Sequence, residues 1–265
     1  MQNKIELEIF PFILVLVVVI FGGLSMIIPQ EVMAEHVLPS YNEVTTLPNF
    51  VTCDSSRTRV ENFVEFLTPI IQYENDLILR DRDLLNNLLN KNKFNPEDSL
   101  WLEKKSIYYK IRSFSFTVDQ IHKLSNRIDI IPKEIVLAQA AVESNWGKSA
   151  FATKHNNLFG TRTTSKENGV VPKKRGNYET FRVASYRTVN QSIRSYLRNL
   201  NTHKAYQDLR DTRAEMRIGN YPLESNILAD NLTAYSTLGF EYVQLIKRTM
   251  RNYQAIFIKN IDKEI

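Results

Sequence analysis

The sequence predicts an α+β fold that is mostly helical, with one small β lobe and a hydrophobic segment at the N-terminus. Apolar residues recur at spacings of three and four over about 58–90 and again over 189–200, which is typical of helices. Between these stretches, residues 157–187 are rich in Gly, Thr, Val and Tyr, which favours short strands and turns. Residues 9–28 contain no charged side chain and match the thickness of a bilayer core.

The composition is that of a globular protein with a basic surface. The chain has 265 residues, 43% of them apolar and 24% charged, which excludes a disordered or collagen-like chain. Cys53 is the only cysteine, so an intramolecular disulfide and a cysteine zinc site are excluded. The net charge is +5, and residues 1–34 carry one Lys and three Glu, so the remainder carries +7. This charge suits an anionic partner, but no nucleic-acid-binding module accompanies it, so we do not expect nucleic acid.

Residues 1–34 have the features of a membrane anchor or a signal segment. The apolar run Ile9–Ile28 is longer than a usual signal core, which favours an uncleaved anchor. Val32-Met33-Ala34 is a passable cleavage site, so a secretory signal stays open. Both alternatives predict that the rest of the chain is exported. Residues 35–57 contain Pro and Ser without a sustained period, and we expect them to form a tether.

We expect residues 58–260 to form a single domain. Its first part, 58–112, is predicted to be a helical extension that packs against the remainder by its apolar repeat. Further helices are expected over about 118–127, 131–145, 189–200, 205–217, 223–235 and 240–257. One small β excursion between runs of helices is the pattern of an α+β domain.

The helix expected within residues 131–149 carries the candidate chemistry. Its residues from Ile135 to Val142 are apolar nearly all round, which predicts a buried helix. Glu143 falls in its last turn and shares a face with Gln139, four residues earlier. Gly147 follows as a natural left-handed cap.

A carboxylate at this position can become a general acid. Burial beside Trp146 and the negative end of the helix dipole would both raise the pKa of Glu143. A carboxylic acid that holds its proton near neutral pH can protonate a leaving oxygen. The alternative is a Glu143 side chain that points into water or pairs with Lys148.

The segment AQAAVESNWGKS, followed by NNLFG, resembles the catalytic-helix signature of the bacterial glucosaminidases, glycoside hydrolase family 73. The longer run is most similar to the Bax-type branch of that group, over roughly residues 115–258. Several separate stretches carry the resemblance in the right order: Ile131-Pro132, Leu137 to Gly147, Asn156 to Gly160, Val171 to Arg175, Arg198 to His203, Ala205-Tyr206, Leu209-Arg210 and Ala234 to Ser236.

The resemblance implies a lysozyme-like fold with a cleft between a helical body and a small β lobe. It implies hydrolysis of the GlcNAc-β-1,4-MurNAc bond of peptidoglycan. From the N-terminal segment we expect the domain to lie in the cell envelope, anchored at the periplasmic side of the inner membrane or secreted. Glu143 stands at the family's catalytic acid position. Tyr235 matches a tyrosine that lines the cleft near the reacting sugar, although a core aromatic is the alternative.

A glycosidase of this kind usually needs a second carboxylate. Glu179 lies in an alternating, strand-like run and matches a Glu often seen in the Bax-type branch, whereas Glu167 lies in a polar loop and is expected to be solvated. We therefore expect Glu179 to be the second group. The acetamido group of the substrate is the alternative, with Tyr235 orienting or stabilising the intermediate.

Four further side chains are candidate sugar contacts. The Asn156 amide could hydrogen-bond a sugar, and Phe159, Trp146 and Tyr186 could each face an apolar sugar surface, with a turn or core role as the alternative. A basic cluster at 173–175 could meet the carboxylates of the stem peptides. The four His show no paired metal spacing and there is no Gly-rich phosphate loop, so we predict no metal or cofactor.

Two other functions remain open from the sequence. A lysozyme or lytic transglycosylase, which would cut the MurNAc-GlcNAc bond, shares the fold and the helix-borne Glu. A catalytically lapsed peptidoglycan-binding protein is the non-enzymatic alternative, and the presence of both Glu143 and Tyr235 argues against it.

Overall fold

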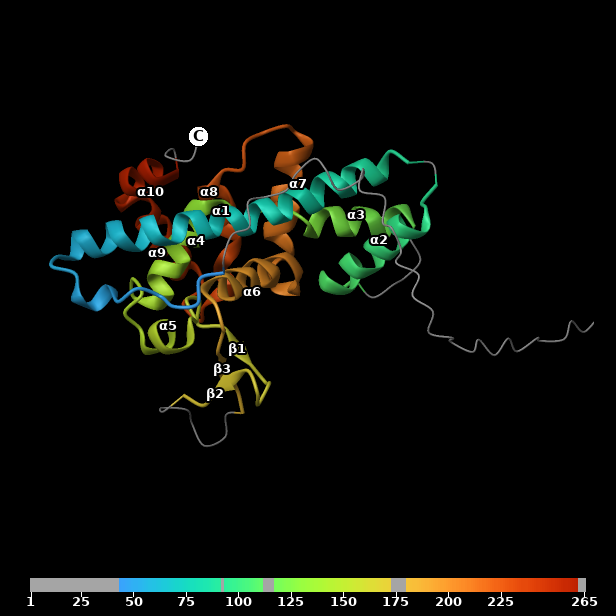
Figure 1. Cartoon of the computed structure of the whole chain (residues 1–265). Helices are drawn as coiled ribbons and strands as arrows, with labels where there is room; N and C mark the ends of the chain where they lie inside the picture. The colour runs from blue at the N-terminus through green and yellow to red at the C-terminus, as the bar shows by residue number, and fades with distance from the viewer. Residues whose placement is uncertain (1–42, 92, 112–116, 173–179, 262–265) are drawn as a thin grey trace, which may run out of the picture. The chain divides into compact units, whose positions relative to one another are not determined.

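A computed structural model describes residues 43–91, 93–111, 117–172 and 180–261. Helices form the body of this part of the chain, and three short strands form a separate lobe (Figure 1). This arrangement confirms the predicted, mostly helical α+β fold. The hydrophobic segment at 1–34 lies outside the described residues.

The elements follow one another in the expected order of helices, strands and helices. The α-helices are α1 (Ser56–Leu89), α2 (Pro96–Tyr108), α3 (Val118–Arg127), α4 (Lys133–Ser144), α5 (Ala150–His155), α6 (Val189–Thr202), α7 (Gln207–Ile218), α8 (Ser225–Ala229), α9 (Phe240–Asn252) and α10 (Gln254–Ile261). The 3₁₀ helices are η1 (Phe50–Thr52), η2 (Lys204–Tyr206) and η3 (Asp230–Tyr235), and the strands are β1 (Arg162–Thr163), β2 (Gly169–Val170) and β3 (Arg182–Ala184).

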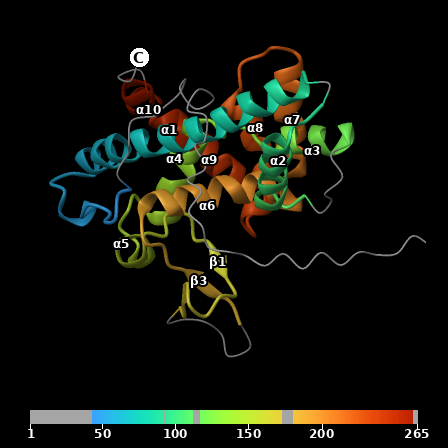
Figure 2. The same cartoon turned by 45° about the vertical axis from the view of Figure 1, so that its right-hand side comes forward.

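Helix α1 runs along the helical body and joins its two cores. The Ser55 hydroxyl caps its first turn by accepting from the Thr58 amide. Helix α1 contacts α4, α6 and α10, and it also contacts α3 (Figures 1 and 2). Leu85 and Leu88, near its C-terminal end, lie in the smaller apolar core with residues of α2 and α3. The helices expected as an extension at 58–112 therefore pack against the rest of the domain.

Helix α4 is enclosed on several sides by other helices. All residues from Ile135 to Ala141 are buried, as the apolar run predicted. Helices α1, α8, α9 and α10 all contact it. Its position in the main core is therefore fixed on several sides, which also fixes the direction in which its C-terminal end points.

The β lobe is small and is held by hydrogen bonds at its base. Its strands are antiparallel in the order β1-β3-β2, with Arg162 opposite Val183 and Val170 also opposite Val183. The buried Asn157 amide donates to the carbonyls of Thr161 (2.9 Å) and Ala184 (2.8 Å). These bonds tie the start of the lobe to its last strand, which matters because strands of two or three residues contribute little stability alone.

The described part of the expected tether, residues 43–57, is docked on the domain. Phe50 is only 2% exposed and packs edge-on against Phe63 (5.4 Å between ring centres) and Phe66 (6.0 Å). The backbone amide of Val189 donates to the Val44 carbonyl. The segment shows no sequence period because it packs as irregular chain with one 3₁₀ turn. The domain therefore begins before residue 58.

None of the helices in the described part of the chain is long and apolar enough to cross a membrane. Residues 9–28 lie outside that part, so the anchor or signal segment stays a prediction.

Replacing Phe50 with Ala should destabilise the domain by roughly 3–5 kcal/mol, because it removes a fully buried ring. Urea unfolding monitored by circular dichroism measures this. Its neighbour Val51 is 56% exposed, so Val51→Ala is the matched control and should stay within about 0.5 kcal/mol of wild type. Equal stability of the two variants would contradict the docking of this segment.

Candidate active site

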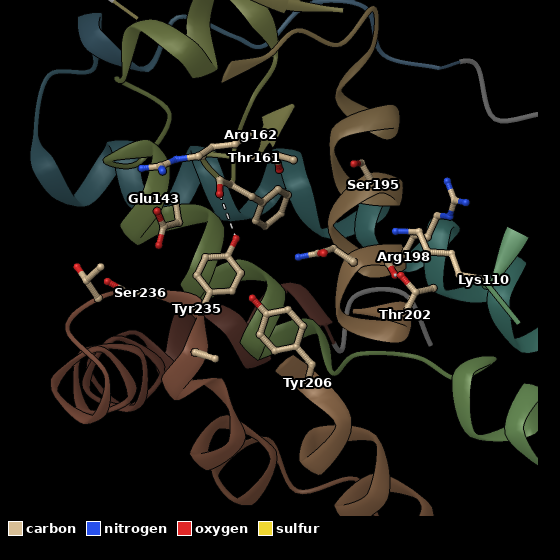
Figure 3. A pocket seen from close by; sticks show the side chains of 15 residues that line it. Lys110, Glu143, Thr161, Arg162, Ser195, Arg198, Thr202, Tyr206, Tyr235 and Ser236 are labelled. Carbon is tan, nitrogen blue, oxygen red and sulfur yellow. Dashed lines mark hydrogen bonds between the residues drawn. The ribbon is translucent and has the colours of Figure 1, made fainter. Parts of the chain in front are cut away.

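A cleft of about 810 Å³ lies where the β lobe joins the helical body. Helix α4 contributes Glu143, η3 contributes Tyr235, and α6 contributes Arg198 (Figure 3). The complete lining is Lys110, Glu143, Phe159, Gly160, Thr161, Arg162, Ser195, Arg198, Asn199, Thr202, Tyr206, Ala234, Tyr235, Ser236 and Thr237. Within the described residues, Glu143 is the one carboxylate in this lining.

A tight turn after α4 places Glu143 at the cleft. Asn145, Trp146 and Gly147 have φ values of 51°, 55° and 75°, so three consecutive residues are left-handed. The Ser144 hydroxyl accepts from the Gly147 amide (2.8 Å), which closes the turn. A Cβ on Gly147 would lie 2.4 Å from the Phe50 ring, so this position needs Gly for its conformation and for space. The docked segment before α1 thus supports the turn that ends α4.

A chain of buried hydrogen bonds leads to the Glu143 carboxyl group. The Tyr242 hydroxyl donates to Glu143 Oε1 (2.8 Å). Gln139 Nε2 donates to the Tyr242 oxygen (2.9 Å), and the Tyr196 hydroxyl donates to Gln139 Oε1. Gln139 is 0% exposed, so its amide has no water to bind instead.

These hydrogen bonds give the two oxygens of the Glu143 carboxyl group different surroundings. Tyr242 has a single hydroxyl proton, and its oxygen already accepts from Gln139, so that proton goes to Glu143 Oε1. Oε2 is therefore the oxygen of Glu143 that does not accept this hydrogen bond. Oε2 lies beside Gly160, which lines the cleft: it is 3.5 Å from the position that a Cβ atom on Gly160 would occupy.

Two opposing effects set the pKa of Glu143. Burial raises the pKa above its usual value, and the hydrogen bond from Tyr242, which favours the carboxylate, lowers it by less. The net direction is upward, as expected from the sequence. Trp146, beside which this burial was expected, does not line the cleft.

Tyr235 lines the cleft and also connects its two sides. Its hydroxyl donates to the Phe159 carbonyl (3.0 Å; Figure 3), and its ring stacks on Tyr242 with 5.4 Å between the ring centres. Burial raises the pKa of Tyr235 well above its usual value, so the hydroxyl stays protonated at neutral pH. Tyr235 therefore lines the cleft and also packs in the core, which the sequence had left as the alternative role.

Phe159 lines the cleft but offers little surface to a ligand. Its side chain is 2% exposed and its ring stacks on Tyr196 at 4.0 Å. Tyr186 does not line this cleft: its hydroxyl donates to Ser195 (2.9 Å), and it borders a neighbouring hollow.

Trp146 and Asn156, expected as sugar contacts, lie outside the cleft. Trp146 packs edge-on against Phe63 (5.6 Å) and Tyr253 (4.7 Å), because the left-handed turn directs it back into the helical body. Asn156 ends α5 with φ 50°, and its buried amide donates to the carbonyls of Thr45 and Tyr186. Both side chains therefore have a structural role in the folded domain.

The second carboxylate expected from the sequence, Glu179, lies outside the described residues, as does the basic cluster at 173–175. Glu167 is exposed in the loop between β1 and β2 and does not line the cleft, as expected for a solvated residue.

Sequence reasoning missed most of the groups that surround Glu143. The sequence placed Gln139 on the face of Glu143, but it did not single out Tyr242 or Tyr196, which lie on α9 and α6. The cleft cations Arg162 and Arg198 lie far apart along the chain, and the sequence did not indicate that they line one cleft.

Comparison with known proteins identifies the family. The family described as mannosyl-glycoprotein endo-beta-N-acetylglucosaminidase (Glucosaminidase) matches residues 118–255. "Protein bax" of Escherichia coli (strain K12) is 30% identical over 200 residues, which cover 75% of this chain and 71% of that protein. The chain belongs to the glucosaminidase family. It is a Bax-type glucosaminidase-domain protein, and Glu143, Tyr235 and Tyr242 all lie within the matched range. No solved structure matches the chain.

Replacing Tyr242 with Phe should raise the pKa of Glu143 further, because it removes a hydrogen bond that favours the carboxylate. A carbon-13 NMR titration of the Glu143 carboxyl measures this shift directly. Tyr221 is 69% exposed, so Tyr221→Phe is the control and should leave the titration unchanged. An unchanged or lower pKa in Tyr242→Phe would show that Tyr242 does not donate to Glu143.

Proposed function

We propose that this chain is a peptidoglycan hydrolase, an endo-β-N-acetylglucosaminidase that cleaves the GlcNAc-β-1,4-MurNAc bond with Glu143 as the general acid. The observation that carries the proposal is the asymmetric environment of Glu143. Tyr242 donates to one oxygen, no side chain among the described residues donates to the other, and burial raises the pKa of Glu143. Membership of the glucosaminidase family supports a bond to N-acetylglucosamine as the target.

The proposed proton transfer starts from Oε2 of Glu143. This oxygen would give its proton to the leaving glycosidic oxygen, a step that contributes about 10²–10⁴-fold in enzymes of this kind. Tyr242 would keep donating to Oε1 as the carboxylate forms, and hydrogen bonds to a charged acceptor are stronger than those to a neutral one. The fixed hydroxyl would thus stabilise the charge that develops during the reaction.

For the second catalytic group we propose Glu179. It would activate a water molecule or stabilise the positive charge at the sugar. If Glu179 does not act, the acetamido group of the substrate would take this role, with the neutral Tyr235 hydroxyl available to orient it.

The proposed substrate also fits the charge and the expected location of the chain. Peptidoglycan is anionic, and the cleft lining includes Lys110, Arg162 and Arg198. We propose that residues 1–34 take the domain across the membrane, so that it works in the cell envelope, either anchored through residues 9–28 or secreted.

Replacing Glu143 with Gln should lower the release of muropeptides from isolated peptidoglycan by at least about 10²-fold, because the amide cannot give up a proton. Mass spectrometry of the products measures both the rate and the bond: the proposal expects reducing GlcNAc ends from the wild type. Glu241 is exposed and outside the cleft, so Glu241→Gln should keep full activity.

Other outcomes of this experiment would contradict the proposal. Reducing or 1,6-anhydro MurNAc ends would indicate a lysozyme or a lytic transglycosylase. Full activity of Glu143→Gln would exclude it as the acid. No products from any variant would favour a peptidoglycan-binding protein.

Replacing Glu179 with Gln should reduce kcat by about 10²-fold or more, since the second carboxylate takes part in the same chemical step. Glu167→Gln, in the exposed loop between β1 and β2, is the matched control and should leave kcat unchanged. Retained activity of Glu179→Gln would assign the second role to the substrate acetamido group.

A further inference from the structure

A second hollow, of about 590 Å³, adjoins the candidate active-site cleft. The two share Thr161, Arg162, Ser195 and Arg198 in their linings. The second hollow lies between the β lobe and α6, and we call it the arginine hollow because Arg162, Arg187, Arg194 and Arg198 line it. Its lining within the described residues includes no Asp or Glu.

One of the four arginines is already neutralised by carboxylates. Arg194 donates to both oxygens of the buried Glu74 (2.8 Å each) and to Glu43 (3.1 Å). These bonds join α6 to α1 and to the segment before α1, so Arg194 has a structural role.

Arg162 and Arg198 are held differently, by aromatic rings. The Arg198 guanidinium lies 4.5 Å over the Tyr108 ring, and its Nε donates to the Tyr108 carbonyl (2.8 Å). The Arg162 guanidinium lies 3.9 Å over the Phe181 ring. Among the ion pairs of the described residues, none includes Arg162 or Arg198. Stacking fixes the plane of a guanidinium while leaving N–H groups at its edge for a ligand.

We propose that the arginine hollow binds the carboxylates of the stem peptide carried by the MurNAc residue next to the cleaved bond. This inference rests on the proposed peptidoglycan substrate. The stem peptide branches from MurNAc, so a glycan strand in the cleft would project it sideways, and the arginine hollow adjoins the cleft at Arg162 and Arg198, which line both. Arginine matches a carboxylate with two parallel hydrogen bonds.

The proposal predicts a preference for glycan strands that carry charged stem peptides. Three soluble, uncross-linked substrates test it: native strands, strands whose carboxyl groups have been amidated, and strands freed of peptide by an amidase. The wild type should cleave native strands with a kcat/KM about tenfold above that for either of the others. Peptide-free strands lose the stem-peptide carboxylates but keep the lactyl carboxylate of MurNAc. Comparing them with native strands therefore shows which of these two carboxylates the hollow binds.

Substitutions in the hollow should reduce the preference. Arg162→Gln and Arg187→Gln should each lower the ratio of kcat/KM for native over amidated strands by about threefold, and Arg162→Lys should recover only part of it, because Lys lacks the planar fork. Raising the salt concentration should weaken the preference of the wild type. Arg248→Gln, an exposed residue that lines neither hollow, is the control and should keep the wild-type ratio.

Binding to the inactive variant Glu143→Gln separates the failure of this inference from the failure of the proposed function. Calorimetric titration with a disaccharide-peptide and with its amidated form should show about tenfold tighter binding of the charged form. Equal binding, or equal cleavage of native and amidated strands by an active wild type, would overturn the inference. Equal cleavage of native and peptide-free strands would also overturn it. Absence of any cleavage would count against the proposed function alone, with the titration still deciding the inference.

Discussion

The site depends on the hydrogen bond from Tyr242 to Glu143 and on the buried helix that makes it possible. Residues Ile135 to Ala141 of helix α4 are buried, and Glu143 follows in its last turn, half-buried at the cleft, where its carboxyl group accepts a hydrogen bond from within the protein. Tyr242 donates this bond from α9, and Gln139 and Tyr196 in turn hold Tyr242. A partly satisfied buried network of this kind would be costly, so each member constrains the next.

The rest of the fold supports this arrangement from outside the cleft. Helix α1 covers α4, and the chain before α1 places Phe50 against the turn at Gly147. On the other side, Tyr235 joins η3 to the loop that leads into the β lobe, through the Phe159 carbonyl. The opposite walls of the cleft are therefore tied to the same aromatic cluster that surrounds Glu143. A substitution in this cluster should therefore change the geometry of the site.

Much of this fold could be predicted from the sequence because it is carried by local patterns. The apolar run of α4, the position of Glu143 in its last turn and the three helices before residue 130 all follow from periodicity and capping residues. Single helices expected at 223–235 and 240–257 are instead divided, into α8 and η3 and into α9 and α10. The apolar period of consecutive short helices does not show where one helix ends and the next begins.

The site was less predictable, since its geometry comes from long-range contacts. Trp146 follows Glu143 by three residues and looked like a cleft residue, but three left-handed residues direct its ring away. Tyr242 lies 99 residues from Glu143, and only the folded chain brings them together. The arginines of the cleft come from separate elements for the same reason.

The most direct test of this account is the pH dependence of kcat/KM for peptidoglycan cleavage by the wild type and by Tyr242→Phe. If Glu143 acts as a proton-carrying acid, activity falls as pH rises through its raised pKa. Loss of the Tyr242 hydrogen bond raises that pKa further, so the alkaline limb of the variant should move to higher pH while its maximal rate falls. An alkaline limb that stays in place would mean that a group other than Glu143 supplies the proton.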